Sequence, residues 1–227
     1  RLFLYNILLN LAIMVRDYIL FDGFTIIILM NILLIAITKT LNNSKFKYFL
    51  QIYLNNSFLK FNSNESSYLS NFNVLLNINF IVSTSVFVTI LLSYLSINKI
   101  SFDASIFLKI LILLVLFICI KYLFEMLIGW AFDISKFVNL FNSQKTSFNK
   151  FIGIIIVLLN SLAFYTFPNS LIFLEISIFI IASLYLIGVY KVIRLNDKLI
   201  LSNMFYFILY LCTLEIVPFL FFINELI

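Results

Sequence analysis

Apolar runs of membrane-spanning length constrain this chain more than any other feature. An α-helix needs roughly 20 apolar residues to cross about 30 Å of hydrocarbon. Six runs approach that length: Phe24–Thr38, Val74–Leu95, Ile106–Ile128, Phe151–Phe167, Leu171–Tyr190 and Leu199–Phe222. Hydrophobic residues make up 63% of the chain and charged residues 11%, which is far from the balance of a soluble protein. The sequence therefore predicts an all-α, multi-pass membrane protein.

The number of crossings depends on the first residues. Leu2–Val15 is apolar but short, and Arg16-Asp17 follows it directly. We expect residues 1–22 to form an N-terminal apolar or interfacial segment, and whether Leu2–Val15 spans the membrane stays open. The prediction is one transmembrane domain over residues 1–227, with about six helices and a range of five to seven. A transmembrane β-barrel is excluded, because the chain has only 4 glycines and 2 prolines for the many turns it would need.

Between the first two spans, aromatic and leucine residues recur at the helical period. They are Phe46, Phe49, Leu50, Tyr53, Leu54 and Phe58, with Lys45, Lys47 and Lys60 beside them. This pattern predicts an amphipathic helix over residues 45–61 that lies in the membrane interface, with its lysines toward anionic headgroups. A soluble binding helix is the rival interpretation. The polar stretch Asn62–Asn73 is expected to be a loop.

Basic residues gather in alternate loops. They fall between spans one and two (Lys39, Lys45, Lys47, Lys60), three and four (Lys136, Lys145, Lys150), and five and six (Lys191, Arg194, Lys198). A six-span path puts these loops on one face, and the positive-inside rule makes that face cytoplasmic. The net charge of +5 is thus explained by topology, and we expect no nucleic-acid partner.

Common catalytic and metal-binding signatures are missing from the sequence. The chain has no histidine, which is the commonest metal ligand and acid–base group. Its two cysteines, Cys119 and Cys212, each lie midway along an apolar run. No P-loop, nucleophile elbow or dinucleotide fingerprint occurs. We therefore expect no enzyme activity, no catalytic residue, no cofactor and no metal.

Glu215 is an acid in the middle of the last apolar run, and Pro218 follows it three residues later. A carboxylate there costs free energy unless the fold supplies a partner. Pro218 also leaves the carbonyl of residue 214 without its helical hydrogen bond. A proton or cation site is one interpretation of Glu215 and Pro218. A hydrogen bond that packs two helices together is the other.

Lys121 and Glu125 lie four residues apart in the third span, so they share one helical face. They form either a buried ion pair lining a polar path, or a structural pair near the cytoplasmic end with Lys121 reaching toward headgroups. We favour the structural pair. Lys109 is expected to be an interfacial anchor, and Glu175 to lie at the outer interface.

Small and polar residues inside the spans favour close helix packing. Ser85, Thr89, Ser93 and Ser96 follow nearly one stripe of the second span, and Gly153, Asn160 and Gly188 are interpreted in the same way. Pro168-Asn169-Ser170 predicts a tight turn, which makes the fourth and fifth spans an antiparallel hairpin.

Five strings of residues together match a known pattern. They are Arg16-Asp17-Tyr18 before Thr25, Lys39 followed by Lys45-Phe46, Lys121-Tyr-Leu-Phe-Glu125 leading to Phe132, Ser147-Phe-Asn-Lys-Phe-Ile-Gly153, and Phe205-Tyr-Phe-Ile-Leu-Tyr-Leu-Cys-Thr-Leu-Glu215-Ile-Val-Pro218. From about Arg16 onward the chain resembles an uncharacterised integral-membrane family of the Bacteroidota, a domain of unknown function. It departs from the family at Tyr18, where tryptophan is usual, and at Asn160, where proline is common. The resemblance implies an inner-membrane location and no particular activity.

Three functions follow from these features. The leading one is a non-enzymatic inner-membrane subunit or scaffold of a cell-envelope complex for secretion, gliding or envelope assembly, with the lipid bilayer and other membrane subunits as its partners. The alternative is a small transporter or a proton- or cation-conducting protein that uses Glu215, with Lys121 and Glu125 as relay groups. A membrane enzyme of lipid intermediates ranks last.

Overall fold

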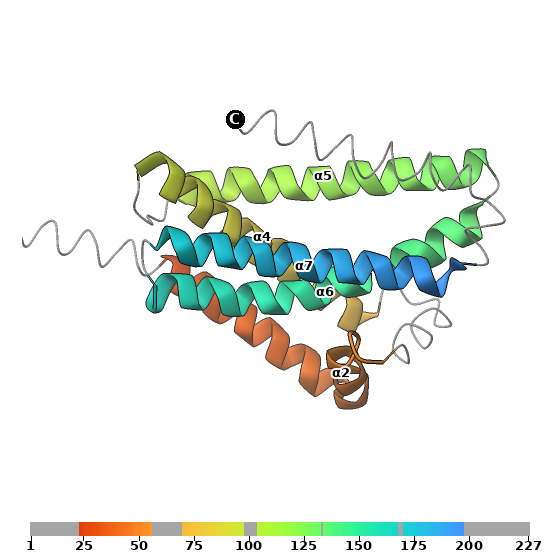
Figure 1. The fold of residues 1–227 in the computed structure, drawn as a ribbon, viewed down its shortest axis with the longest axis horizontal. Coiled ribbons are helices and arrows are strands. Elements are labelled where there is room, and N and C mark those ends of the chain that lie inside the picture. Colours follow the sequence, from red (N-terminus) through yellow and green to blue (C-terminus); the bar gives the residue numbers. More distant parts are fainter. Residues whose placement is uncertain (1–22, 56–69, 98–103, 133, 168–169, 198–227) are drawn as a thin grey trace, which may run out of the picture.

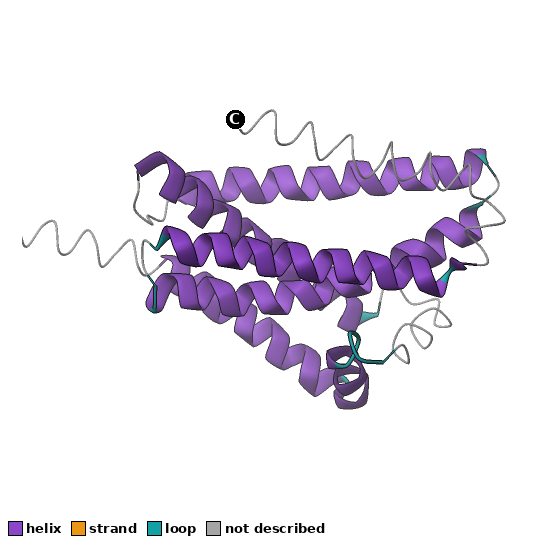
Figure 2. Cartoon of the chain, in the orientation of Figure 1, coloured by secondary structure: helices purple, strands orange, loops and turns teal. Residues whose placement is uncertain are grey.

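The computed structural model describes residues 23–55, 70–97, 104–132, 134–167 and 170–197, and these contain six helices and no strand (Figures 1 and 2). The helices are Gly23–Leu41, α2 (Asn43–Leu50), α4 (Asn71–Ile97), α5 (Ala104–Ala131), α6 (Ser135–Tyr165) and α7 (Leu171–Leu195). All except α2 are long and apolar enough to cross a membrane. The predicted all-α, multi-pass class is therefore confirmed. The segment 1–22 and the predicted span Leu199–Phe222 lie outside the described residues.

The outer faces of the long helices are apolar. Ile26, Leu123 and Phe179 are 60%, 57% and 73% exposed, and many other large hydrophobic side chains are exposed with them. A soluble protein rarely exposes apolar surface on this scale. The faces therefore suit contact with the hydrocarbon of a bilayer.

Helix α6 is the centre of the described bundle. Within its most apolar stretch 61% of the residues are buried, against 6% in α5. α6 packs against α4, α5 and α7, whereas α5 runs along one side of the bundle (Figure 1). α6 and α7 are antiparallel neighbours, as the predicted hairpin requires.

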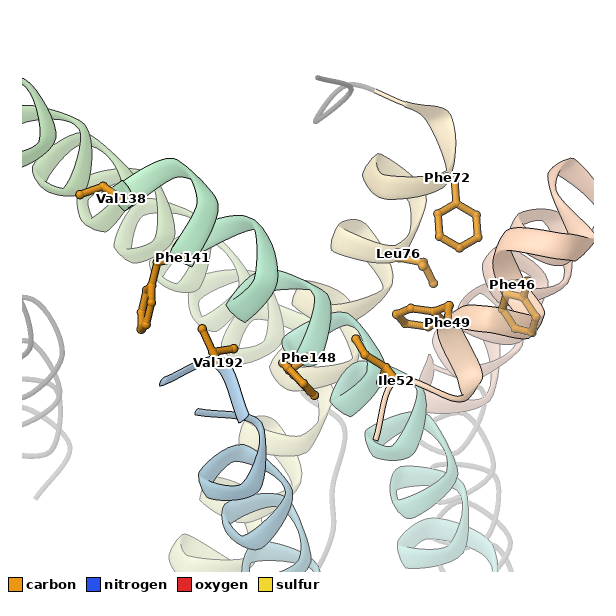
Figure 3. Packing of buried hydrophobic residues seen from close by; sticks show 9 residues of the cluster. All are labelled: Phe46, Phe49, Ile52, Phe72, Leu76, Val138, Phe141, Phe148 and Val192. Atoms are coloured by element: carbon orange, nitrogen blue, oxygen red, sulfur yellow. The ribbon is translucent and has the colours of Figure 1, made fainter. Parts of the chain in front are cut away.

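The ends of the helices that border the basic segments lie together, on the right in Figure 1, and we call this the lysine-rich end. Its core is formed by nine buried side chains from α2, α4, α6, α7 and the turn after α2 (Figure 3). They are Phe46, Phe49, Ile52, Phe72, Leu76, Val138, Phe141, Phe148 and Val192. A second core near the opposite end joins Phe24, Val86, Ile90, Phe107, Ala163, Phe164 and Leu174. The predicted grouping of these connecting segments on one face is thus observed.

The amphipathic helix is shorter than the predicted range 45–61. α2 begins after Asn42, whose side chain accepts a hydrogen bond from the Lys45 amide, and it ends at Leu50. The chain then turns so that the Tyr53 hydroxyl donates to the Leu184 carbonyl at 2.9 Å, while the Lys191 amine donates to the Tyr53 carbonyl. Burial raises the pKa of the Tyr53 phenol, which keeps it a donor at neutral pH. The segment therefore docks on α7, and its helix stops where docking begins.

The fourth predicted span begins too late. We expected a loop containing Lys136, Lys145 and Lys150, followed by a helix from residue 151, but α6 is helical from Ser135. Val138, Phe141, Phe148 and Ile152 recur at helical spacing and are buried, so this stretch has an apolar face despite its lysines. Residues 71–73, expected to be loop, already belong to α4.

Glycines let α6 approach its neighbours closely. A Cβ atom at Gly153 would lie 2.8 Å from the Phe80 Cα atom of α4, and one at Gly188 would lie 3.0 Å from the Phe148 ring. Ser85, Thr89 and Ser93 are also buried, and the Thr89 hydroxyl donates to the Ser85 carbonyl at 2.7 Å. The packing interpretation of these residues is confirmed, and the Ser96 side chain lies outside the described residues.

Gly153→Ala is expected to destabilise the protein by about 1–3 kcal/mol, because the added methyl group meets backbone atoms that cannot move aside. Thermal unfolding in detergent, followed by loss of the monodisperse peak on size exclusion, measures the change. Ala182→Val is the control, since Ala182 is exposed on α7. Equal stability of the Gly153→Ala variant and the wild type would contradict the close packing of α4 and α6.

Candidate functional site

The inward stripe of α5 carries the candidate site. Only three residues of α5 are buried, namely Phe107, Glu125 and Gly129. Eighteen residues are about five helical turns and four residues are about one, so all three lie on the same stripe. Lys121, one turn before Glu125, lies on this stripe too and is half-buried. The Glu125 side chain is only 6% exposed, so the carboxyl group lies inside the protein.

Helix α6 supplies the partners of Glu125. The Asn142 Nδ2 atom donates to Glu125 Oε2 at 2.7 Å. Lys145, three residues later, is 7% exposed, and its amine lies within hydrogen-bonding reach of Lys121 and within electrostatic range of Glu125. Tyr185 from α7 also lies within electrostatic range of Lys121 and Glu125. We call Lys121, Glu125, Asn142, Lys145 and Tyr185 the lysine–glutamate cluster.

The local fold brings these helices together. Gly129 lies beside the start of α6, where a Cβ atom would come within 3.3 Å of the Ser135 Cα atom, so α5 and α6 approach closely at their turn. Gly188, three residues after Tyr185, allows α7 to lie against Phe148 of α6. The two glycines thus allow α5 and α7 to approach the part of α6 that carries Asn142 and Lys145.

The cluster contains two amines and one carboxyl group. Two basic side chains therefore share one acidic partner, Glu125. Charges buried in a low-dielectric interior interact far more strongly than they do in water. The cluster is therefore chemically able to exchange a proton or to bind a small ion.

Further polar contacts flank the cluster on α6. The Asn196 Nδ2 atom at the end of α7 donates to Gln144 Oε1 at 2.7 Å. The Lys150 amine donates to Asn73 Oδ1 of α4 at 2.9 Å, and both residues are buried. Polar side chains in the lysine-rich half of α6 thus have hydrogen-bond partners on α4 and at the end of α7.

The structure tests only part of the predicted site. Lys121 and Glu125 share a face as their spacing predicts, and they meet α6 and α7 there. Lys109 and Glu175 are exposed near the starts of α5 and α7. Glu215 and Pro218 lie outside the described residues, so their role stays a prediction.

Sequence reasoning missed Asn142, Lys145 and Tyr185. The signal was present in residues 138–152, where apolar residues recur at positions 138, 141, 148 and 152. Position 145 completes that stripe, so helical periodicity indicates a buried lysine. The prediction instead places Lys145 in a loop between the third and fourth spans.

Apolar spanning helices around a buried charged cluster define a multi-pass α-helical membrane protein. The family model described as Domain of unknown function (DUF4271) matches residues 24–226. The chain therefore belongs to this family, which confirms the predicted membership of an uncharacterised family. Searches of the curated proteins and of the solved structures gave no match.

Glu125→Leu is expected to destabilise the protein by about 3 kcal/mol, because it leaves buried amines without their carboxylate. Unfolding in mixed detergent and dodecyl sulfate micelles measures the free energy. Adding Lys145→Met to Glu125→Leu should restore part of the loss, since the unpaired charge is removed.

Glu175→Leu serves as the control, because Glu175 is exposed on α7 and should change stability by less than about 0.5 kcal/mol. If Glu125→Leu is as stable as this control, the carboxylate does not hold the cluster together.

Proposed function

We propose that this protein is a non-enzymatic integral membrane protein that moves protons or small ions, and that the lysine–glutamate cluster is part of its path. The observation that carries the proposal is the burial of Glu125 and Lys145, at 6% and 7% exposure, within two spanning helices. Ionisable residues inside spans are costly, and they commonly mark ion pathways and proton relays. Lys121, Glu125 and Lys145 are the groups that exchange the proton or hold the ion.

A structural role is the competing explanation of the cluster. A buried ion pair can specify how helices fit together without adding stability. In that role the cluster only fastens α5 to α6, and its protons never need to move. Charge-removing substitutions that keep the shape of the side chain separate the two roles.

The test uses the full chain in proteoliposomes that contain a pH-sensitive dye, with a potassium diffusion potential as the driving force. We expect the wild type to carry protons above the rate of empty vesicles. Glu125→Gln and Lys145→Met should each lower that rate at least tenfold, because they remove a relay group and preserve side-chain size.

Lys109→Met is the matched control, since Lys109 is exposed on the same helix and outside the cluster. Its rate should equal that of the wild type. Two outcomes would refute proton transport through the cluster. One is a wild-type rate equal to that of empty vesicles at both polarities of the potential, and the other is a wild-type rate in both cluster variants.

A second candidate function is a subunit or scaffold of a cell-envelope complex in the inner membrane. The exposure of α5 favours it, because most of its 28 residues, including Leu116, Leu123 and Trp130, are exposed along the whole helix. In this role the apolar face of α5 contacts a spanning helix of another membrane protein, and the lysine-rich end faces the cytoplasm.

Photocrosslinking in native membranes tests this role. A photoreactive residue at Leu123 of α5 should give one discrete protein adduct, whereas the same residue at Phe179 of α7, which is also exposed, should give only lipid adducts. The adduct should also co-purify with the wild-type chain without crosslinking. Lipid adducts alone at both positions would argue against a partner on α5.

A further inference from the structure

Three asparagines are buried in the bundle, one on each of three helices. Asn31 of helix Gly23–Leu41 is 2% exposed, Asn79 of α4 is 0% exposed and Asn160 of α6 is 1% exposed. The Oδ1 atom of each asparagine, and the Nδ2 atom of Asn79, have no hydrogen-bond partner among the described residues. Inside a membrane bundle, such atoms cost free energy unless something pairs with them.

Asn31 and Asn160 lie at similar distances along their helices from a contact that joins the two helices. The Tyr165 hydroxyl of α6 donates to Thr25 Oγ1 at 3.0 Å, and the two helices run in opposite directions (Figure 1). Asn31 comes six residues after Thr25, and Asn160 comes five residues before Tyr165. At about 1.5 Å per residue, Asn31 lies about 9 Å along its helix from Thr25, and Asn160 lies about 7.5 Å along α6 from Tyr165.

Asn79 belongs to the same region through Ser83. The Asn160 Nδ2 atom donates to the Ser83 carbonyl at 2.9 Å. Asn79 lies four residues before Ser83 and therefore on the same face of α4, about 6 Å lower along the helix. Each of three helices thus carries buried, unpaired amide atoms in this part of the bundle.

We propose that this group of asparagines, Asn31, Asn79 and Asn160, is a binding site for ordered water inside the bundle. The unpaired atoms include three acceptors and one donor, and water can pair with both kinds. Buried water typically makes about three hydrogen bonds to such groups. Asn160 lies eighteen residues, or about five helical turns, along α6 from Asn142 of the lysine–glutamate cluster, and the site does not depend on the proposed transport.

A metal cation fits this group of asparagines less well than water. Glu125 is the one buried carboxylate among the described residues, and it binds Asn142 instead. Lys150 of α6 binds Asn73, which precedes Asn79 on α4, and its positive charge repels a cation. The unpaired Nδ2 donor of Asn79 would also gain nothing from a cation.

X-ray radiolysis of the full chain in lipid nanodiscs tests the proposal, because hydroxyl radicals from tightly bound water oxidise adjacent side chains. Leu76 and Ile156 lie one turn from Asn79 and Asn160 and are 0% and 2% exposed. We expect mass spectrometry to show them oxidised at least five times faster than Ile90 and Val192, which are equally buried elsewhere. Equal oxidation rates at all four positions in the wild-type protein would overturn the proposal.

Substitution locates the water. Asn79→Leu should lower oxidation of Leu76 and Ile156 to the rate of Ile90, whereas Asn71→Leu, at an exposed position of α4, should change nothing. If Asn79→Leu does not fold, Asn31→Leu should give the same decrease. The alternative ligand is a cation. It would be indicated by a melting temperature that rises with sodium or potassium but not with choline at equal ionic strength, provided that the variant loses this response.

Discussion

Hydrogen bonds from α6 to every other described spanning helix determine how this bundle is assembled. They join Asn142 to Glu125 of α5, Gln144 to Asn196 after α7, Lys150 and Asn160 to Asn73 and Ser83 of α4, and Tyr165 to Thr25 of helix Gly23–Leu41. Lipid tails are as apolar as leucine, so apolar contact alone does not choose one helix neighbour over another. Directional polar contacts can, and here α6 supplies one for each neighbour.

The two polar regions of α6 differ in charge, and this difference separates their chemistry. In its lysine-rich half the helix presents Asn142 and Lys145 to the Glu125 carboxylate. About five turns farther along, it presents Asn160, a neutral amide that donates to the Ser83 carbonyl of α4. One half of α6 thus carries charged groups, whereas the other half carries a neutral hydrogen-bonding amide.

Local sequence patterns predicted the helices well where the membrane-spanning residues are apolar throughout. The apolar runs of α4, α5 and α7 were placed within a few residues of their described ends, because length and composition suffice there. The start of α6 was missed because Lys145, Gln144 and Lys150 lower its hydropathy although all three are buried. Likewise, the shared face of Lys121 and Glu125 follows from helix geometry, but their partners Asn142 and Tyr185 are distant in the chain.

By itself the sequence determined that this is an all-α chain with several membrane-spanning helices, and that Lys121 and Glu125 share one helical stripe. Both properties depend on spacing within a single helix, which the order of residues specifies directly. Only the tertiary structure decided that Glu125 binds Asn142, that Lys150 binds Asn73, and that three buried asparagines have unpaired amide atoms. Those pairings depend on which helices lie side by side, and that follows from packing across the whole bundle.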